Sequence, residues 1–175
     1  FAPEQQVLER AARDRAPYDV WMKQGYITGT PGASVDYDYV AYRLAYLDST
    51  MNIEAVFFDR WRIDVLEAAL QRVVDNPDIP YKPELNLIPF GQGYKDMAPA
   101  MDNAEAVLMN HKIRHGNHPV LTMCCANAVV DTDPAGNRKL NKAKSTGRID
   151  GTVSLVMTMG VREVDDSPQY EVFFA

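Results

Sequence analysis

The chain has 175 residues, of which 46% are hydrophobic, so it has the size of one ordinary domain and enough apolar residues to bury a core. Its formal net charge of -6 argues against a protein that binds nucleic acid over its whole surface, because phosphate contact normally requires a basic face. The absence of an apolar run near the roughly 20 residues that span a bilayer, and of a charged segment ahead of an apolar one, predicts a soluble protein without a signal peptide.

Helices dominate the expected structure of the first fifty residues. Residues 4–15 and 17–24 each predict a short polar helix, and residues 26–30 predict a strand. Asp36 is placed to cap the helix that follows, in which apolar residues recur on one face.

The clearest predicted strand covers residues 53–59. It is almost wholly apolar, which is typical of a strand buried on both faces, and Asp59 falls at its C-terminal end, where open α/β sheets place their sites. A helix is expected from about Ile63. Beyond a proline-rich connection, residues 85–90 predict another strand, and a further helix extends to about Asn110.

The last third predicts a hairpin followed by one more element. Residues 128–131 and 137–140 flank a turn with the proline and glycine that favour a β-hairpin. The segment after Asp150 alternates like a strand and also fits the helical period, and its length and terminal glycine favour the helix. Short apolar runs alternating with longer amphipathic ones predict an α/β domain.

Asp59 and Asp150 are the principal candidates for a functional site, since each lies at the end of a predicted element. Neither has an obvious partner cation in its sequence surroundings. If the two carboxylates are brought together in space, binding of a divalent metal explains their proximity better than a structural role does. The hypothesis to test is then metal-dependent cleavage of phosphodiester bonds. The alternative is that each carboxylate merely caps the helix or turn beside it.

A basic run precedes Asp150. Residues 138–149 contain five basic side chains and no acidic one, namely Arg138, Lys139, Lys142, Lys144 and Arg148. This local patch could hold DNA phosphates despite the acidic chain, or it could be a solvated face of the hairpin.

Three histidines suggest a zinc site only weakly. His111, His115 and His118 are closely spaced, but Gly116 interrupts the helix that would align the first two, and no cysteine or carboxylate lies nearby.

The cysteines indicate the redox environment of the protein, and the first residue indicates whether the sequence is a fragment. Cys124 and Cys125 are adjacent, which is a poor geometry for a disulfide and favours a reducing cytosol. The sequence starts at Phe1 rather than methionine, which predicts a fragment of a longer protein.

Several short motifs occur in the order found in the large subunits of tailed-bacteriophage terminases. They are P-Y-D-V-W at 17–21, T-P-G at 30–32, V-D-Y-D at 35–38, F-D-R-W at 58–61, P-F-G-Q-G at 89–93, R-H-G-N-H-P-V-L at 114–121, D-T-D-P-A-G-N at 131–137 and K-A-K-S-T-G-R-I-D-G at 142–151. Residues 1–161 therefore resemble the C-terminal nuclease domain of that family. Residues 162–175 lie outside the match and are expected to form a C-terminal tail.

The resemblance implies a ribonuclease H-like fold, with a mixed sheet flanked by helices and a β-hairpin before the last helix. It also implies an endonuclease that cuts concatemeric viral DNA during packaging into the capsid, in the host cytoplasm and away from any membrane. In that family an acidic cluster binds two Mg²⁺ or Mn²⁺ ions, and two of its carboxylates correspond to Asp59 and Asp150. The basic run would hold double-stranded DNA. Portal and small terminase subunit would be partners of the full-length protein.

One departure from the family pattern is expected. Family members carry another metal-binding aspartate on the first strand of the nuclease sheet, and nothing in residues 1–30 matches that strand. Either an N-terminal portion is omitted, or part of the sheet and one ligand are lacking. Two other functions stay open: a noncatalytic DNA-binding or packaging module of the same fold, and a different ribonuclease H-like enzyme such as a resolvase, which should prefer branched DNA.

Overall fold

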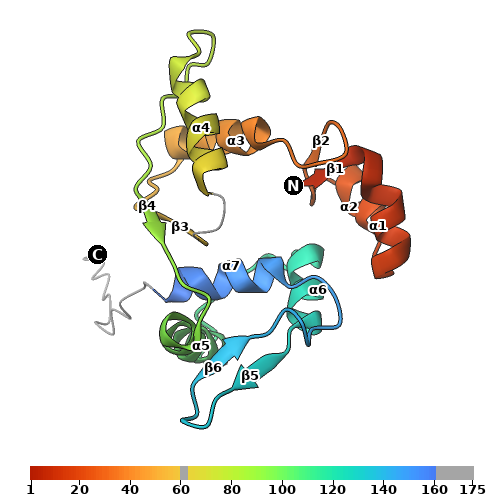
Figure 1. Ribbon diagram of the computed structural model, residues 1–175, viewed down its shortest axis with the longest axis vertical. Coiled ribbons are helices and arrows are strands. Elements are labelled where there is room, and N and C mark those ends of the chain that lie inside the picture. Colours follow the sequence, from red (N-terminus) through yellow and green to blue (C-terminus); the bar gives the residue numbers. More distant parts are fainter. Residues whose placement is uncertain (60–62, 161–175) are drawn as a thin grey trace, which may run out of the picture.

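A computed structural model describes residues 1–59 and 63–160. The elements fall into three groups in Figure 1: an N-terminal group, a pair of helices packed on each other, and a larger C-terminal group. In chain order they are β1 (Ala2–Pro3), the 3-10 turn η1 (Glu4–Gln6), α1 (Val7–Asp14), α2 (Tyr18–Lys23), β2 (Gly29–Thr30), α3 (Tyr37–Thr50), β3 (Val56–Phe58), α4 (Ile63–Asp75), β4 (Leu87–Pro89), α5 (Tyr94–Met109), α6 (Pro119–Asn127), β5 (Val130–Thr132), β6 (Arg138–Leu140) and α7 (Asp150–Met159).

The N-terminal group contains the two predicted polar helices and a strand shorter than predicted. β2 covers only two residues of the expected strand, and it pairs in parallel with β1. The shortening has a local cause, because the amides of Tyr26 and Ile27 donate to the carbonyl of Trp21 at 2.8 and 3.3 Å and so close the end of α2. Those two amides are therefore not available to a strand partner.

The pair α3 and α4 has its own hydrophobic core. Asp36 caps α3 as predicted, since its carboxylate accepts a hydrogen bond of 2.9 Å from the amide of Asp38. The two helices meet through Ala41 and Ala69, both with 0% exposure, and small residues at such positions allow close approach. This core is separate from the one described next.

The second core joins α5 to α7. Met97 in α5 and Ile149, directly before α7, are 1% and 2% exposed and belong to one cluster with Phe90 and Val153. At the end of α7 a Cβ on Gly160 would lie 2.7 Å from the ring of Phe90, so only glycine permits this packing. The prediction that the segment after Asp150 is a helix is confirmed.

The predicted single mixed sheet is wrong for the described residues. They form three two-stranded sheets: β1–β2 and β3–β4 are parallel, and β5–β6 is antiparallel. The physical reason is that helices pack in two separate cores, so no common helical layer covers one continuous sheet. β3 is also only partly buried, contrary to the expectation of a strand buried on both faces. The α/β class itself is correct.

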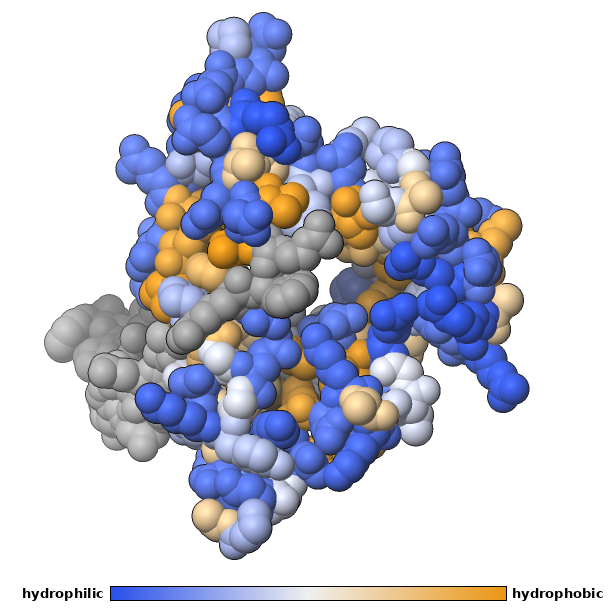
Figure 2. Space-filling view, in the orientation of Figure 1, coloured by the Kyte–Doolittle hydropathy of each residue, from blue (hydrophilic) through white to orange (hydrophobic). Residues whose placement is uncertain are grey.

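The hairpin is confirmed and one helix was not predicted. β5 and β6 are joined by a turn in which Gly136 has a φ of 87°, a conformation that glycine adopts readily. Helix α6 begins at Pro119, and proline at a first helical position was the available signal. Within residues 1–59 and 63–160 the structure contains no helix that could traverse a lipid bilayer. Figure 2 shows a largely hydrophilic face, with hydrophobic residues gathered around β3 and β4.

Candidate functional site

Asp59 lies immediately after β3 and is exposed. Two residues earlier, the ring of Phe57 contacts that of Phe90 with centroids 6.4 Å apart, so β3 is anchored on the core formed by α5 and α7. The alternative interpretation of Asp59 as a cap for the next helix involves residues 60–62, which lie outside the described part of the chain.

Asp150 is the first residue of α7, and it is not the N-cap. The N-cap is Ile149, and no side chain caps this end. The Asp150 carboxylate has 69% relative exposure and lies 3.3 Å from Nζ of Lys142. The expectation that Asp150 has no partner cation is therefore wrong. The cause is a turn at Asn141, whose side-chain oxygen accepts hydrogen bonds from the amides of residues 143 and 144 and directs the chain back toward α7.

The two candidate acids flank the same core without forming a complete metal cluster in the described residues. Phe57 and Ile149, close in sequence to Asp59 and Asp150 respectively, both pack in the α5–α7 core. Residues 1–59 and 63–160 contain no group of three or more histidine, cysteine or acidic side chains placed to hold a metal ion. Asp150 lines a pocket, whereas Asp59 is not part of its lining.

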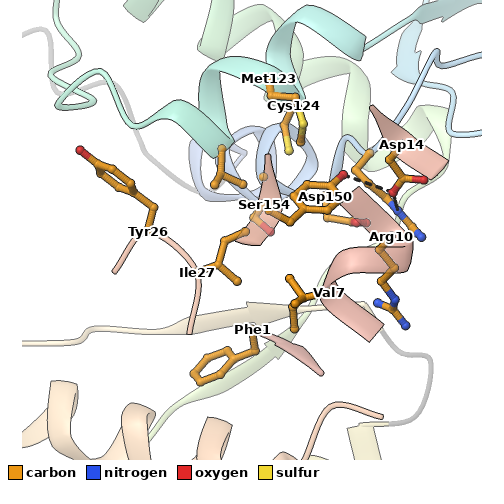
Figure 3. Close-up of a pocket in the computed structure, with 15 residues that line it drawn as sticks. Phe1, Val7, Arg10, Asp14, Tyr26, Ile27, Met123, Cys124, Asp150 and Ser154 are labelled. Carbon is orange, nitrogen blue, oxygen red and sulfur yellow. Dashed lines mark hydrogen bonds and ion pairs between the residues drawn. The ribbon is translucent and has the colours of Figure 1, made fainter. Parts of the chain in front are cut away.

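This pocket, of about 360 Å³, lies between the N-terminal group and helices α6 and α7 (Figure 3). Its lining mixes aromatic, aliphatic and charged side chains: Phe1, Ala2, Val7, Arg10, Asp14, Tyr18, Tyr26, Ile27, Val120, Met123, Cys124, Arg148, Asp150, Gly151 and Ser154. The ion pair between Asp14 and Arg148 forms one side of the pocket. In Figure 3 Arg10 and Asp14 lie on the side opposite Tyr26.

Asp14 is the centre of this ion-pair cluster. Its carboxylate lies 2.8 Å from Nε of Arg13 and 3.3 Å from Nε of Arg148, and it accepts a hydrogen bond of 3.2 Å from the hydroxyl of Tyr18. The hydrogen bond from Arg13, reinforced by Arg148, lowers the pKa of Asp14 to about 2. Burial, with the nearby Asp14 charge, raises the pKa of Tyr18 to about 12. Asp14 is therefore ionised and Tyr18 protonated at neutral pH.

The hairpin cations are paired with carboxylates from other elements. Arg138 lies 2.5 Å from Asp102 and 2.7 Å from Glu105, both on α5. Lys144 lies 2.6 Å from Asp131, and the hydrogen bond from Lys144 is the main reason why the pKa of Asp131 is lowered. The basic run is thus less electropositive than its sequence indicates, although exposed pairs of this kind are weak.

The other predicted DNA-binding cations also have partners. The ammonium of Lys139 lies 4.5 Å from the ring centroid of Tyr94. Lys142 contacts Asp150, and Arg148 contacts Asp14, as described above. The structure therefore brings Lys142, Arg148 and Asp150 to one region, and it places Arg138, Lys139 and Lys144 along the hairpin.

In the part of the chain that the structure describes, the histidines and cysteines form no metal site. Of the three histidines, His118 makes an edge contact with Tyr26, with ring centroids 5.0 Å apart. None of the three belongs to a metal-binding cluster in the described residues. Cys124 is buried and Cys125 exposed, and neither forms a disulfide, in line with the sequence.

The comparisons with known proteins show the family. The family model "Terminase large subunit, endonuclease domain" matches residues 2–165. The chain belongs to this family. It is 47% identical over 160 residues to the terminase large subunit of Enterobacteria phage HK97, covering 91% of this chain and 30% of that protein.

The structural comparison agrees with this assignment. The crystal structure of the HK97 bacteriophage large terminase matches with a TM-score of 0.82 and 47% identity, over 91% of this chain and 32% of that one. A second relative, protein YmfN of Escherichia coli K12, is 26% identical over 145 residues, which cover 82% of this chain and 30% of YmfN. This terminase endonuclease domain thus spans about a third of the length of the proteins it matches.

Sequence reasoning did not single out the pocket residues Arg10, Tyr18 and Tyr26. Arg10 lies in α1, Tyr18 begins α2 and Tyr26 follows α2, and only the folded chain brings the three residues opposite α7. The four-residue spacing between Asp14 and Tyr18 across the end of α1 was the one available signal.

Proposed function

We propose that this domain is a metal-dependent DNA endonuclease with a ribonuclease H-like active site, which cuts concatemeric viral DNA during genome packaging. The observation that carries the proposal is the family match over residues 2–165, together with 47% identity to the HK97 terminase large subunit. Asp59 and Asp150 are the proposed catalytic metal ligands.

Support for these two ligands comes from their surroundings. Each acid closely follows a residue that packs in the same core, Phe57 before Asp59 and Ile149 before Asp150, and this packing positions the backbone that carries each carboxylate. Both side chains belong to exposed residues, and a metal that keeps several waters needs such access. Among the residues that the structure describes, Asp150 forms one exposed ion pair, with Lys142, and such a pair is weak enough for a divalent cation to displace.

The donor chemistry fits Mg²⁺ or Mn²⁺. Both are hard cations that take carboxylate and water oxygens, and Mg²⁺ is commonly bound through one or two carboxylates. Two such ions would activate a water and stabilise the departing 3′ oxygen. Asp59 and Asp150 supply oxygen ligands. A further carboxylate, on the family's first nuclease strand, would complete the set.

The proposed substrate is double-stranded DNA, gripped without sequence readout. Arg138, Lys139, Lys142, Lys144 and Arg148 would contact phosphates, and their present partners would have to be exchanged for phosphate oxygens. Because such contacts are sequence-independent and exposed, binding should fall steeply with salt. Through the rest of a full-length protein, the portal and the small terminase subunit are proposed partners in the host cytoplasm.

Calorimetric titration with Mn²⁺ tests the metal site without requiring cleavage. Wild type should bind Mn²⁺, and Asp59→Asn and Asp150→Asn should each weaken binding by about tenfold or more. Asp19→Asn, which also removes one negative charge, should bind like wild type. Equal Mn²⁺ affinity in all four proteins would contradict the assignment and favour the noncatalytic DNA-binding module.

A further inference from the structure

We propose that the pocket between α1 and α7 holds one unpaired nucleotide of the DNA, with Arg10 contacting its phosphate and Tyr26 lying against its base. This inference rests on the proposed nuclease function, since it adds a substrate subsite beside Asp150.

The size and lining of the pocket suit a nucleotide. Its volume of about 360 Å³ lies within the range of roughly 300–1,000 Å³ typical of small-ligand sites. Val7, Ile27, Val120 and Met123 provide apolar walls for a base. Arg10 and Asp14 lie on the side opposite Tyr26 (Figure 3), and Arg148 is paired with Asp14, so a charged wall faces an aromatic one.

Arg10 is the cation best placed to meet a phosphate. Its Nε and one terminal nitrogen donate to Oε1 of Gln6 at 3.2 and 2.8 Å. Gln6 is neutral, so these bonds orient the guanidinium without compensating its charge. Arg148, the other lining arginine, is already paired with Asp14. Among the described residues Arg10 has no carboxylate partner, and its remaining donors suit phosphate oxygens.

Tyr26 provides an aromatic surface on the other side. It is 45% exposed although it lines the pocket, and its ring contacts that of His118 with centroids 5.0 Å apart. This contact orients the ring and leaves much of it uncovered. Proteins that bind single strands stack bases on exposed aromatic rings in this way.

Asp150, one of the two proposed metal ligands, lines the same pocket, so a bound nucleotide would lie beside the proposed cleavage site. A nucleotide in the pocket would be adjacent to a phosphodiester bond cleaved at Asp150. Stacked and paired bases of an intact duplex cannot enter such a pocket, so the occupant would be an extruded or frayed nucleotide. The Lys142 ammonium, 3.3 Å from Asp150, would lie beside the neighbouring phosphate.

The test is binding of a short fluorescein-labelled oligothymidylate, followed by anisotropy in EDTA so that cleavage cannot occur. Arg10→Gln should weaken binding by about tenfold and reduce the salt slope by about 0.7, the value for one phosphate contact on a single strand. Arg15→Gln is the matched control, because Arg15 is exposed near the end of the same helix and does not line the pocket. Its affinity should stay within about twofold of wild type.

A second pair of variants tests the base contact. Tyr26→Leu should weaken binding by about tenfold, whereas Tyr26→Phe should bind like wild type, because stacking requires the ring and not the hydroxyl. The residue is exposed, so neither change should unfold the protein, and circular dichroism checks this.

The results separate this inference from the nuclease proposal. The pocket proposal is overturned if wild type does not bind the oligothymidylate at low salt, or if Arg10→Gln binds it as well as Arg15→Gln does. It is also overturned if Arg10→Gln weakens the binding of a blunt duplex as much as it weakens the binding of the single strand. If those results accompany plasmid cleavage that depends on Asp150, only the pocket proposal fails. If the binding effects are seen and no variant cleaves, only the nuclease proposal fails.

Discussion

The guanidinium of Arg148 lies 3.3 Å from the carboxylate of Asp14, although 134 residues separate them in sequence. Asp14 ends α1, and Arg148 comes two residues before α7. The pair therefore fastens the N-terminal group to the part of the chain that carries Asp150, and it forms one side of the pocket between them.

Asp14→Asn should destabilise the protein by roughly 1 kcal/mol at pH 7, because two partly exposed arginines lose their partner and solvent screens much of the interaction. Urea unfolding of wild type and variant measures this. Asp19→Asn is the control for loss of one negative charge nearby, and its free energy of unfolding should change little. An Asp14→Asn variant as stable as wild type would show that the pair does not fasten the two parts.

The same contribution should depend on pH in a defined direction. The folded pKa of Asp14 is about 2, below the ordinary value of 3.8 for an aspartate, so its stabilising effect is present above about pH 4 and is lost as pH falls toward 2. The difference in unfolding free energy between wild type and Asp14→Asn should shrink over that interval. A difference that grew on acidification would contradict the assigned direction of the shift.

Met97→Ala should be the more damaging of two methionine truncations in α5. Met97 is 1% exposed within the core shared with α7, and removing a buried side chain of this size costs about 2–5 kcal/mol. Met109 is 74% exposed at the end of the same helix, so Met109→Ala should change stability by less than about 0.5 kcal/mol. Thermal or urea unfolding compares them, and similar losses would refute the placement of Met97 in the core.

Apart from α6, the helices and the hairpin were predictable because their signals are local. Asp36 stands directly before the helix it caps, and the apolar spacing after Ile63 has the helical period. The proline and glycine between β5 and β6 specify a turn whatever the rest of the chain does. The pairing of strands depends instead on how helices from distant parts of the chain pack. The helices pack in two separate cores, and three two-stranded sheets are found where a single sheet was expected.

The candidate site was predictable only in part for the same reason. The positions of Asp59 and Asp150 at element ends follow from the sequence, since element boundaries are local. The partners of the basic residues do not, because Asp102 and Glu105 reach Arg138 only after α5 packs on the hairpin. Charge counted along a segment therefore overestimated the electropositive character of the folded surface.

If the hairpin contacts DNA phosphates, removing the acidic partners of Arg138 should strengthen DNA binding. Asp102→Asn combined with Glu105→Gln removes its two partners, so affinity for duplex DNA at low salt should rise and the salt slope should increase by about 0.9. Fluorescence anisotropy at several salt concentrations measures both quantities.

The matched control for this prediction is Asp64→Asn combined with Glu67→Gln on α4. Both residues are exposed, and the charge change is the same. If the two double variants bind DNA equally, the gain reflects net charge alone, and Arg138 is not a DNA contact.

Nicking of supercoiled plasmid in the presence of Mn²⁺ tests the central claim most directly. Wild type and the control Asp19→Asn should convert the plasmid to nicked and linear forms. Asp150→Asn and Asp59→Asn should lose at least about 100-fold in rate while keeping a folded circular dichroism spectrum. Cleavage by Asp150→Asn at the wild-type rate, or no cleavage by wild type, would contradict the account.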